Sequence, residues 1–464
     1  MSSPPAPESR SSAAVTAEAL STASFLRVYA RPTGDAVAAA GLLARAARAL
    51  DTPFHVRTTR EQSVPDNSAD DDSSTVTVGW RAPAGVTLDS EPGGAVSLVA
   101  AEAVREAGGE PDPVLALAGA VAGGVALDGG SGAPADSGEE TRGVGTLTEA
   151  ARRHDAVSRR PGVSVPTTDL ADGLAHTTLL RLPVSGDPAA AASLIREVAP
   201  AVGESVSVDA SALDTEAHRD LASLVALDAT GDAEPTAVAA TERTLRPRVT
   251  AAGPFETIAG FADVLAATAR TDPGVAVALA LDPDAVAETA LDRWRSHGAV
   301  VHRLLDAART ARYDGVFVVR VDDTEAATSV ADAETSVVTV ASALPAVARL
   351  ADAFRAPEPT TLAVSETAAV VVTDGTERSA VDVLAAVVDT TDWRVERDGD
   401  GDHGDDETHL TGHAARAVLG VEETTRSGSE VDPDAVVDTD VDPDAVVGTE
   451  IDPDAVVDGV RRAV

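Results

Sequence analysis

Cysteine and lysine are both absent from this chain of 464 residues, and aromatic residues make up only 2% of it. Without cysteine the chain can form no disulfide, no thiolate metal site and no cysteine nucleophile. Without lysine it cannot build a G-x-x-x-x-G-K-[ST] phosphate-binding loop, and every basic side chain apart from histidine is an arginine. The shortage of aromatic rings leaves few platforms on which unpaired bases could stack, which argues against sequence-tolerant binding of single strands.

Long apolar runs and a secretion signal are missing as well. The longest uncharged apolar run, 114–127, is too short to span a bilayer and is typical of a buried helix or a helix–strand pair. The N-terminus lacks the basic segment followed by an apolar segment that a secretion signal requires. We therefore expect a cytoplasmic protein with no membrane partner.

Negative charge dominates the charged residues that are present. The chain carries 76 acidic and 36 basic residues, which gives a formal net charge of −40. Hydrophobic residues make up 44% of the chain, which is too many for a disordered acidic polymer. This composition is typical of a protein adapted to high salt, where screening removes most of the self-repulsion and carboxylates keep the surface hydrated. The acidity therefore says little about binding partners.

Short β-prone runs alternate with helical patterns from residue 25 onward. This alternation predicts an α/β protein whose mostly parallel sheet has helices on both faces. In the segment 251–282, the pattern predicts a helix followed by a buried strand. Asp282 and Pro283 then predict the start of another helix, as N-cap and first helical residue. The expected elements of the first sheet are strands at 25–30, 53–58, 75–79 and 85–88 and helices at 35–50 and 93–107.

Four segments are expected along the chain. They are a disordered tail at 1–22, a large α/β domain at 23–340, a smaller α/β domain at 350–425 and an acidic tail at 426–464. The acidic tail repeats the sequence D-P-D-A-V-V three times with a period of ten residues. Low-complexity composition is the simpler interpretation of these repeats, and a docking segment that folds on a partner is the alternative.

Aspartates follow three of the expected strands or apolar segments. Asp35, Asp89 and Asp128 each come where such a segment ends. The carboxyl ends of parallel strands meet at one edge of a sheet, so the three side chains are expected to converge. Three carboxylates could hold one Mn²⁺ or Mg²⁺ ion, but hardly a tight pair of ions. Taken singly, each aspartate would be interpreted as a helix cap or a turn residue.

The order of these segments resembles the DHH phosphoesterase superfamily, in particular the archaeal RecJ-like nucleases. The first motif of that superfamily resembles H-x-D-x-D-G-x-x-A-A, and this chain has Arg31-Pro32-Thr33-Gly34-Asp35-Ala36 in its place. The second motif is an aspartate that ends a strand, where this chain has Gly79-Trp80. The name-giving D-H-H corresponds to Asp89-Ser90-Glu91, and the fourth motif, a single aspartate, corresponds to Asp128.

The resemblance implies that most metal ligands of the superfamily are lost from this chain. Asp35, Asp89 and Asp128 remain as candidate ligands, and Glu91 is a candidate oxygen ligand in place of a histidine. Arg31 puts a permanent positive charge where the first motif has a histidine. It would stand in for the charge of a metal ion, and we regard it as a candidate phosphate contact.

Two weaker similarities lie further along the chain. The stretch 253–271 resembles the helical segment that precedes the second domain in the archaeal proteins. Gly412 and His413 resemble part of the G-G-H-x-x-A-A-G signature of the associated substrate-binding domain, and are candidate substrate contacts there.

The resemblance implies a RecJ-like protein that has lost its metal site, has no resident cofactor and serves replication or repair as a scaffold. The partners implied by analogy with the inactive DHH-family subunit of the eukaryotic replicative helicase are the GINS complex, the replicative helicase or an active RecJ-like paralogue. The alternative is a Mn²⁺-dependent, single-strand-specific exonuclease or phosphodiesterase with a reduced metal site of Asp35, Asp89 and Asp128. If active, such an enzyme would use Mn²⁺ or Mg²⁺. A third possibility is a nucleic-acid-binding module without protein partners. Single-stranded nucleic acid is a candidate partner.

Overall fold

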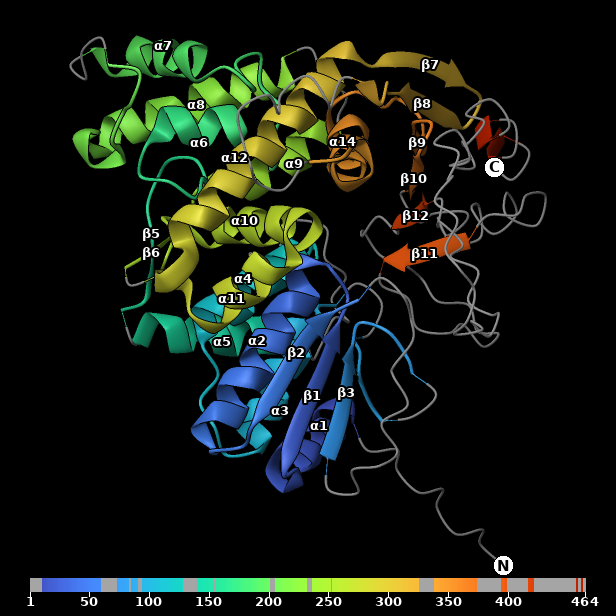
Figure 1. Cartoon of the computed structure of the whole chain (residues 1–464). Helices are drawn as coiled ribbons and strands as arrows, with labels where there is room; N and C mark the ends of the chain where they lie inside the picture. The colour runs from blue at the N-terminus through green and yellow to red at the C-terminus, as the bar shows by residue number, and fades with distance from the viewer. Residues whose placement is uncertain are drawn as a thin grey trace, which may run out of the picture.

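The computed structural model holds two main sheets with helices packed around and between them (Figure 1). A third, two-stranded sheet of β5 (Val157–Arg159) and β6 (Arg248–Thr250) is antiparallel. The structure describes residues 11–59, 73–82, 85–90, 94–127, 140–153, 155–200, 205–231, 236–251, 253–324, 338–373, 394–398, 416–420, 456–457 and 460–461.

The first sheet has four strands in the order β2-β1-β3-β4, all of them parallel. Its central strand β1 is apolar and largely buried, and Val28 lies opposite Val56 on one side and Val76 on the other. The predicted α/β class with a parallel sheet flanked by helices is confirmed. The strands are β1 (Phe25–Ala30), β2 (Phe54–Thr58), β3 (Ser73–Val78) and β4 (Val86–Leu88).

Small residues let the helices around this sheet approach one another closely. A Cβ added to Gly41 would lie only 2.5 Å from the Cβ of Ala280, and one added to Gly119 would lie 2.6 Å from that of Ala38. The alanine-rich composition thus serves a tightly packed helical layer. The helices before residue 154 are α1 (Ser12–Thr22), α2 (Gly34–Ala49), α3 (Val96–Glu106), α4 (Pro113–Ala122) and α5 (Glu140–Arg153).

Helix α1 corrects the expectation of a disordered tail over 1–22. The Ser11 hydroxyl caps it by accepting a hydrogen bond from the backbone N–H of Ala14, and Leu20 is 1% exposed. The helix packs against α3 and β4. Its Ala- and Ser-rich sequence is only weakly amphipathic, so the sequence pattern did not reveal it. Residues 1–10 of the expected tail lie outside the described residues.

Helix α11 (Pro273–Leu281) stands where we predicted a buried strand, so that prediction was wrong. Asp272 accepts a hydrogen bond from the N–H of Val275, and Pro273 occupies the first helical position. A short apolar run fits a buried strand or a buried helix equally well, and here the cap at its start decides for the helix. Its neighbours α10 (Ile258–Thr271) and α12 (Pro283–Ala307) are helical as predicted.

The second sheet has six strands in the order β11-β12-β10-β9-β8-β7, and only β8 and β9 pair in parallel. It begins at Arg309, so two of its strands come before the expected boundary at residue 350. Helix α14 (Val340–Phe354) packs against β9 and β10. The strands are β7 (Arg309–Tyr313), β8 (Val316–Arg320), β9 (Thr360–Val364), β10 (Ala368–Thr373), β11 (Arg394–Asp398) and β12 (Arg416–Gly420).

Two hydrophobic cores follow from this arrangement. The first surrounds the parallel sheet, and the second joins the helices of 163–240 to α14 and the second sheet. Helix α12 belongs to both, because Trp294 lies in the first core and Val301 and Leu305 lie in the second. The remaining helices are α6 (Leu170–His176), α7 (Pro188–Val198), the 3₁₀ turn η2 (Ala210–Ala212), α8 (Thr215–Thr230) and α9 (Thr236–Thr244).

Candidate functional site

The expected site lies at the carboxyl end of the parallel sheet, where β1 passes into α2. Thr33 caps α2, its hydroxyl accepting a hydrogen bond from the N–H of Ala36 at 3.4 Å. Asp35 therefore lies in the first turn of α2, where the helix dipole favours a negative charge. The strand–helix corner predicted from the sequence is present.

The carboxylate of Asp35 is used to cap a second helix. Its Oδ2 accepts a hydrogen bond from the backbone N–H of Val96 at 2.8 Å, and its Oδ1 accepts one from Ser97 at 3.0 Å. The residue at the N-cap of α3, Ala95, has no side chain that can do this. Asp35 thus satisfies two N–H groups that the first turn of α3 would otherwise leave without a partner.

Arg31 lies beside the position where the second motif of the superfamily has its aspartate. Arg31 is 8% exposed, and a Cβ added to Gly79 would lie 3.6 Å from the Arg31 Cδ. Gly79 has a φ of 78°, in the left-handed region that favours glycine. The charged side chain of Arg31 therefore packs against Gly79, and the left-handed backbone at Gly79 disfavours an aspartate there.

Asp89 takes part in a local turn that is tied to α1. Its Oδ1 accepts a hydrogen bond from the N–H of Ser90 at 3.0 Å. Its own N–H donates to the hydroxyl of Ser12 at 3.3 Å, and that hydroxyl donates to the carbonyl of Thr87. Asp89 thus has the turn role that a single aspartate at a strand end often has.

The other candidate residues are not placed by the structure. Glu91, Asp128, Gly412 and His413 all lie outside the described residues. Within the described ranges, no three histidine, aspartate or glutamate side chains gather in a way that could hold a metal ion. The oxygens of Asp35 accept from backbone N–H groups and Arg31 brings a positive charge, so the described residues do not fit the two-ion chemistry of the superfamily.

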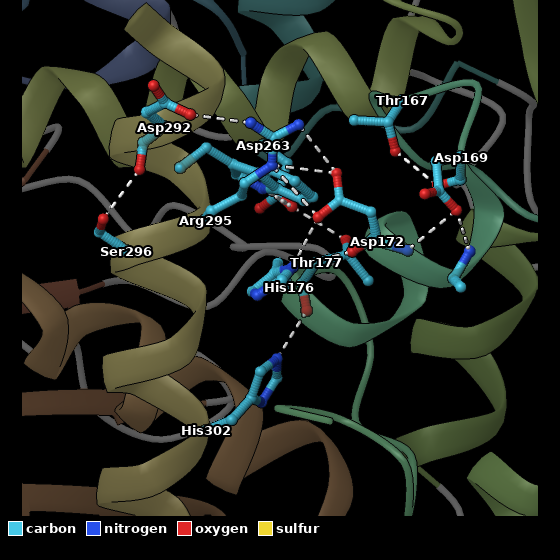
Figure 2. A network of polar contacts seen from close by, with 12 residues as sticks. Thr167, Asp169, Asp172, His176, Thr177, Asp263, Asp292, Arg295, Ser296 and His302 are labelled. Carbon is cyan, nitrogen blue, oxygen red and sulfur yellow. Dashed lines mark hydrogen bonds and ion pairs between the residues drawn. The ribbon is translucent and has the colours of Figure 1, made fainter. Parts of the chain in front are cut away.

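A buried polar network that the sequence did not reveal lies further along the chain, around Asp263 of α10 (Figure 2). Asp263 is 3% exposed and accepts hydrogen bonds from the N–H of Thr178, the hydroxyl of Thr177 and the indole N–H of Trp294, at 3.0, 2.9 and 2.8 Å. The hydroxyl of Thr178 donates to its second oxygen at 2.5 Å. This carboxylate joins α10 and α12 to the loop after α6.

Asp172 forms a second part of the network, at the side of an open cavity of about 740 Å³. It is paired with Arg295 at 3.0 Å and with His176 at 3.0 Å. Burial tends to raise the pKa of Asp172, but the hydrogen bonds and charges of His176 and Arg295 outweigh it and hold the pKa below the ordinary value. Acidic side chains, among them Asp169, surround this cavity. Because its arginine is already paired, the described lining of the cavity offers no free anion site.

Two histidines of α12 are buried and neutral. Burial, with the nearby charges of Arg270 and Arg349, lowers the pKa of His297 to about 3. Burial and Arg181 lower the pKa of His302 to the same value. The Nε2 of His302 donates to the carbonyl of Thr177 at 2.9 Å, so Arg181 donates to its Nδ1 at 3.1 Å. These histidines serve packing.

No helix within the described residues is both long and apolar enough to cross a membrane. This agrees with the short apolar runs of the sequence.

Solved structures similar to this chain include RecJ, the nuclease whose archaeal relatives the sequence motifs resemble. RecJ of Thermus thermophilus in complex with Mn²⁺ is 16% identical with a TM-score of 0.41, over 88% of this chain and 51% of that one. The chain thus spans about half the length of that RecJ. CDC45 of Entamoeba histolytica is 8% identical with a TM-score of 0.49, over 85% of this chain and 92% of that one.

A protein of similar sequence gives the nearer relationship. The uncharacterized protein rrnAC1427 of Haloarcula marismortui is 40% identical over 375 residues, which cover 81% of this chain and 87% of that protein. The family model of the rrnAC1427 C-terminal domain matches residues 308–447, a range that begins within one residue of the second sheet. At this identity and coverage, the chain belongs to the rrnAC1427 protein family.

Proposed function

We propose that this protein is a DHH-like protein which has lost metal-dependent cleavage and acts as a scaffold in DNA replication or repair in the cytoplasm. The observation that carries the proposal is the bonding of Asp35. Its two oxygens accept from Val96 and Ser97, so the first-motif carboxylate has a structural role that needs no metal ion.

The change at the histidine position of the first motif supports the same proposal. A cation at Arg31 repels a metal ion, and the φ of 78° at Gly79 disfavours a side chain in the place of a further ligand. An arginine in this place is suited to hold a phosphate group of a nucleic acid without cleaving it. Arg31 is therefore the side chain through which we expect contact with single-stranded nucleic acid.

The proposed partners follow from the motif resemblance. They are the GINS complex, the replicative helicase or an active RecJ-like paralogue. Because the surface is strongly acidic, we expect binding to these proteins to persist in molar KCl. Binding to nucleic acid alone falls steeply as salt rises.

The test is a degradation assay with the purified full chain in molar KCl and added Mn²⁺, on labelled single-stranded DNA and RNA. The control is the double variant Asp35→Asn/Asp128→Asn, which removes two of the three carboxylates of the alternative site. We expect both proteins to leave the strands intact. If the natural chain degrades the strands in the presence of Mn²⁺ and the double variant does not, the exonuclease or phosphodiesterase alternative is established.

The scaffold role needs its own measurement. The tagged full chain is mixed with purified GINS complex, replicative helicase and RecJ-like paralogue, one at a time, in molar KCl. We expect the chain to retain one of them, and the Asp35→Asn/Asp128→Asn variant to retain the same one. Retention of none would contradict the proposed partners.

A further inference from the structure

The last repeat of the acidic tail ends in a buried segment. Residues 456–457 and 460–461 are helical, and Val456, Val457 and Val460 are between 0% and 2% exposed. The guanidinium of Arg461 lies 4.4 Å from the ring centroid of Tyr313, on the edge strand β7. Figure 1 shows the C-terminal helical residues, in red, close to the end of β7.

The spacing of the three valines fits one side of a helix. Positions i and i+4 are neighbours on a helical surface, and position i+1 lies about 100° around the helix from position i, so a broad apolar face can bury all three. Burying a valine completely is among the larger single contributions that a short segment can make to docking. An arginine over an aromatic ring adds a cation–π attraction and fixes the position of the segment along the strand.

The other two copies of the repeat lack part of this set. All three share D-P-D-A-V-V, but the tenth position is Asp440 in the first copy, Glu450 in the second and Val460 in the third. The residue after it is Val441 or Ile451 in the first two copies and Arg461 in the third. Val460 is 0% exposed, so a carboxylate in its place would bring a charge into a buried position, which is costly.

We propose that the surface around Tyr313 is a docking site for segments of the form A-V-V-x-x-V-R, and that the third repeat of this chain occupies it. The first two repeats are poor ligands, because their tenth residue is acidic and their next residue is not a cation. A segment attached to its own docking site acts at an effective concentration on the order of mM. The site is thus closed to the same segment supplied from outside until the attached copy is released.

The test measures binding of a fluorescein-labelled peptide of residues 451–464 to full-length chains by anisotropy. The variant Val456→Asp/Val457→Asp releases the attached copy, and Val436→Asp/Val437→Asp makes the same change in the first repeat as a matched control. We expect the peptide to bind the released variant at least tenfold tighter than the natural chain or the control. Adding Tyr313→Ala to the released variant should weaken the binding of the peptide at least tenfold. Adding Tyr313→Phe, which keeps an aromatic ring, should not.

One further comparison tests the selectivity. A peptide with Val460→Asp should bind the released variant at least tenfold more weakly than the natural peptide. Equal binding of these two peptides, or equal binding of the natural peptide to all three chains, would overturn the proposal. So would failure of the peptide to bind the released variant.

Hydrogen exchange of the natural chain gives a check that needs no variant. The amides of residues 456–461 should exchange at least tenfold more slowly than those of residues 436–441, which occupy the same positions in the first repeat. Equal exchange in the two segments would contradict a docked third copy.

Discussion

The carboxylate of Asp35 accepts a hydrogen bond from the backbone N–H of Val96 at 2.8 Å, across 61 residues of sequence. With the bond from Ser97, it holds the first turn of α3 against the first turn of α2. Asp35, which corresponds to a metal ligand of the first motif, thus caps α3 and joins it to α2 within the first core. This relationship governs the interpretation of every substitution at that position.

Replacing Asp35 should cost stability. Asp35→Ala removes the cap of α3 and leaves two N–H groups to find other partners, so we expect a loss of about 1–2 kcal/mol. Asp35→Asn keeps one acceptor oxygen and should lose less. The measurement is urea unfolding in molar KCl. Asp89→Ala is the control. Among the described residues, the carboxylate of Asp89 accepts only from its neighbour Ser90, so its loss should cost less than about 0.5 kcal/mol.

Asp263 should be much more sensitive than Asp35. Asp263→Ala leaves the donors of Thr177, Thr178 and Trp294 buried without an acceptor, and we expect a loss of more than about 3 kcal/mol in the same urea experiment. Thr177→Val removes one donor and keeps the carboxylate, so it should cost about 1–2 kcal/mol. Equal effects of the two changes would show that the network is not held by the carboxylate.

Stability should fall as the pH is lowered below about 6.5. His297 and His302 have a pKa of about 3 in the folded chain and an ordinary pKa of 6.5 when unfolded. Between these pH values the unfolded chain binds protons that the folded chain does not. Each histidine should therefore lower the free energy of unfolding by about 1.4 kcal/mol for every pH unit that the pH falls. Their contribution is complete above pH 6.5 and is lost progressively toward pH 3.

Urea unfolding between pH 7.5 and 5 checks this dependence. Below pH 6, His302→Gln and His297→Gln should each reduce the slope of the free energy of unfolding against pH by the equivalent of one proton, about 1.4 kcal/mol per pH unit. A slope unchanged in both variants would mean that the two histidines titrate normally in the folded chain.

The contact between α6 and α12 allows no extra carbon at Gly298. A Cβ there would lie 2.0 Å from the carbonyl oxygen of His176, so Gly298→Ala should destabilise the chain by several kcal/mol, at least about 2. Gly145→Ala, in α5, is the matched control. A Cβ at Gly145 meets nothing within 4 Å, and the change should stabilise by about 0.5–1 kcal/mol through helix propensity. Thermal unfolding of both variants beside the natural chain gives the comparison.

The first sheet was predictable because its signals are local. Each strand is a short β-prone run, and the corner from β1 to α2 has a cap residue in sequence. The errors at α1 and α11 arose where local signals were weak or ambiguous. A nine-residue apolar run such as Pro273–Leu281 suits a strand as well as a buried helix, and only its capping residue distinguishes the two.

The candidate site was only partly predictable. The sequence placed Asp35 after β1. The two N–H groups that donate to it belong to α3, 61 and 62 residues later in the chain, and no local pattern indicates this contact. Asp263 was missed for the same reason, because Thr178 lies 85 residues before it and Trp294 lies 31 residues after it. Only the fold brings such donors to one carboxylate.

Calorimetric titration of Mn²⁺ into the full chain in molar KCl tests the central claim most directly. If Asp35 is a structural cap and Arg31 excludes a cation, the natural chain and Asp35→Asn should give the same heats, with no stoichiometric binding. Binding of one or two Mn²⁺ ions per natural chain that Asp35→Asn abolishes would contradict the account and make Asp35 a metal ligand.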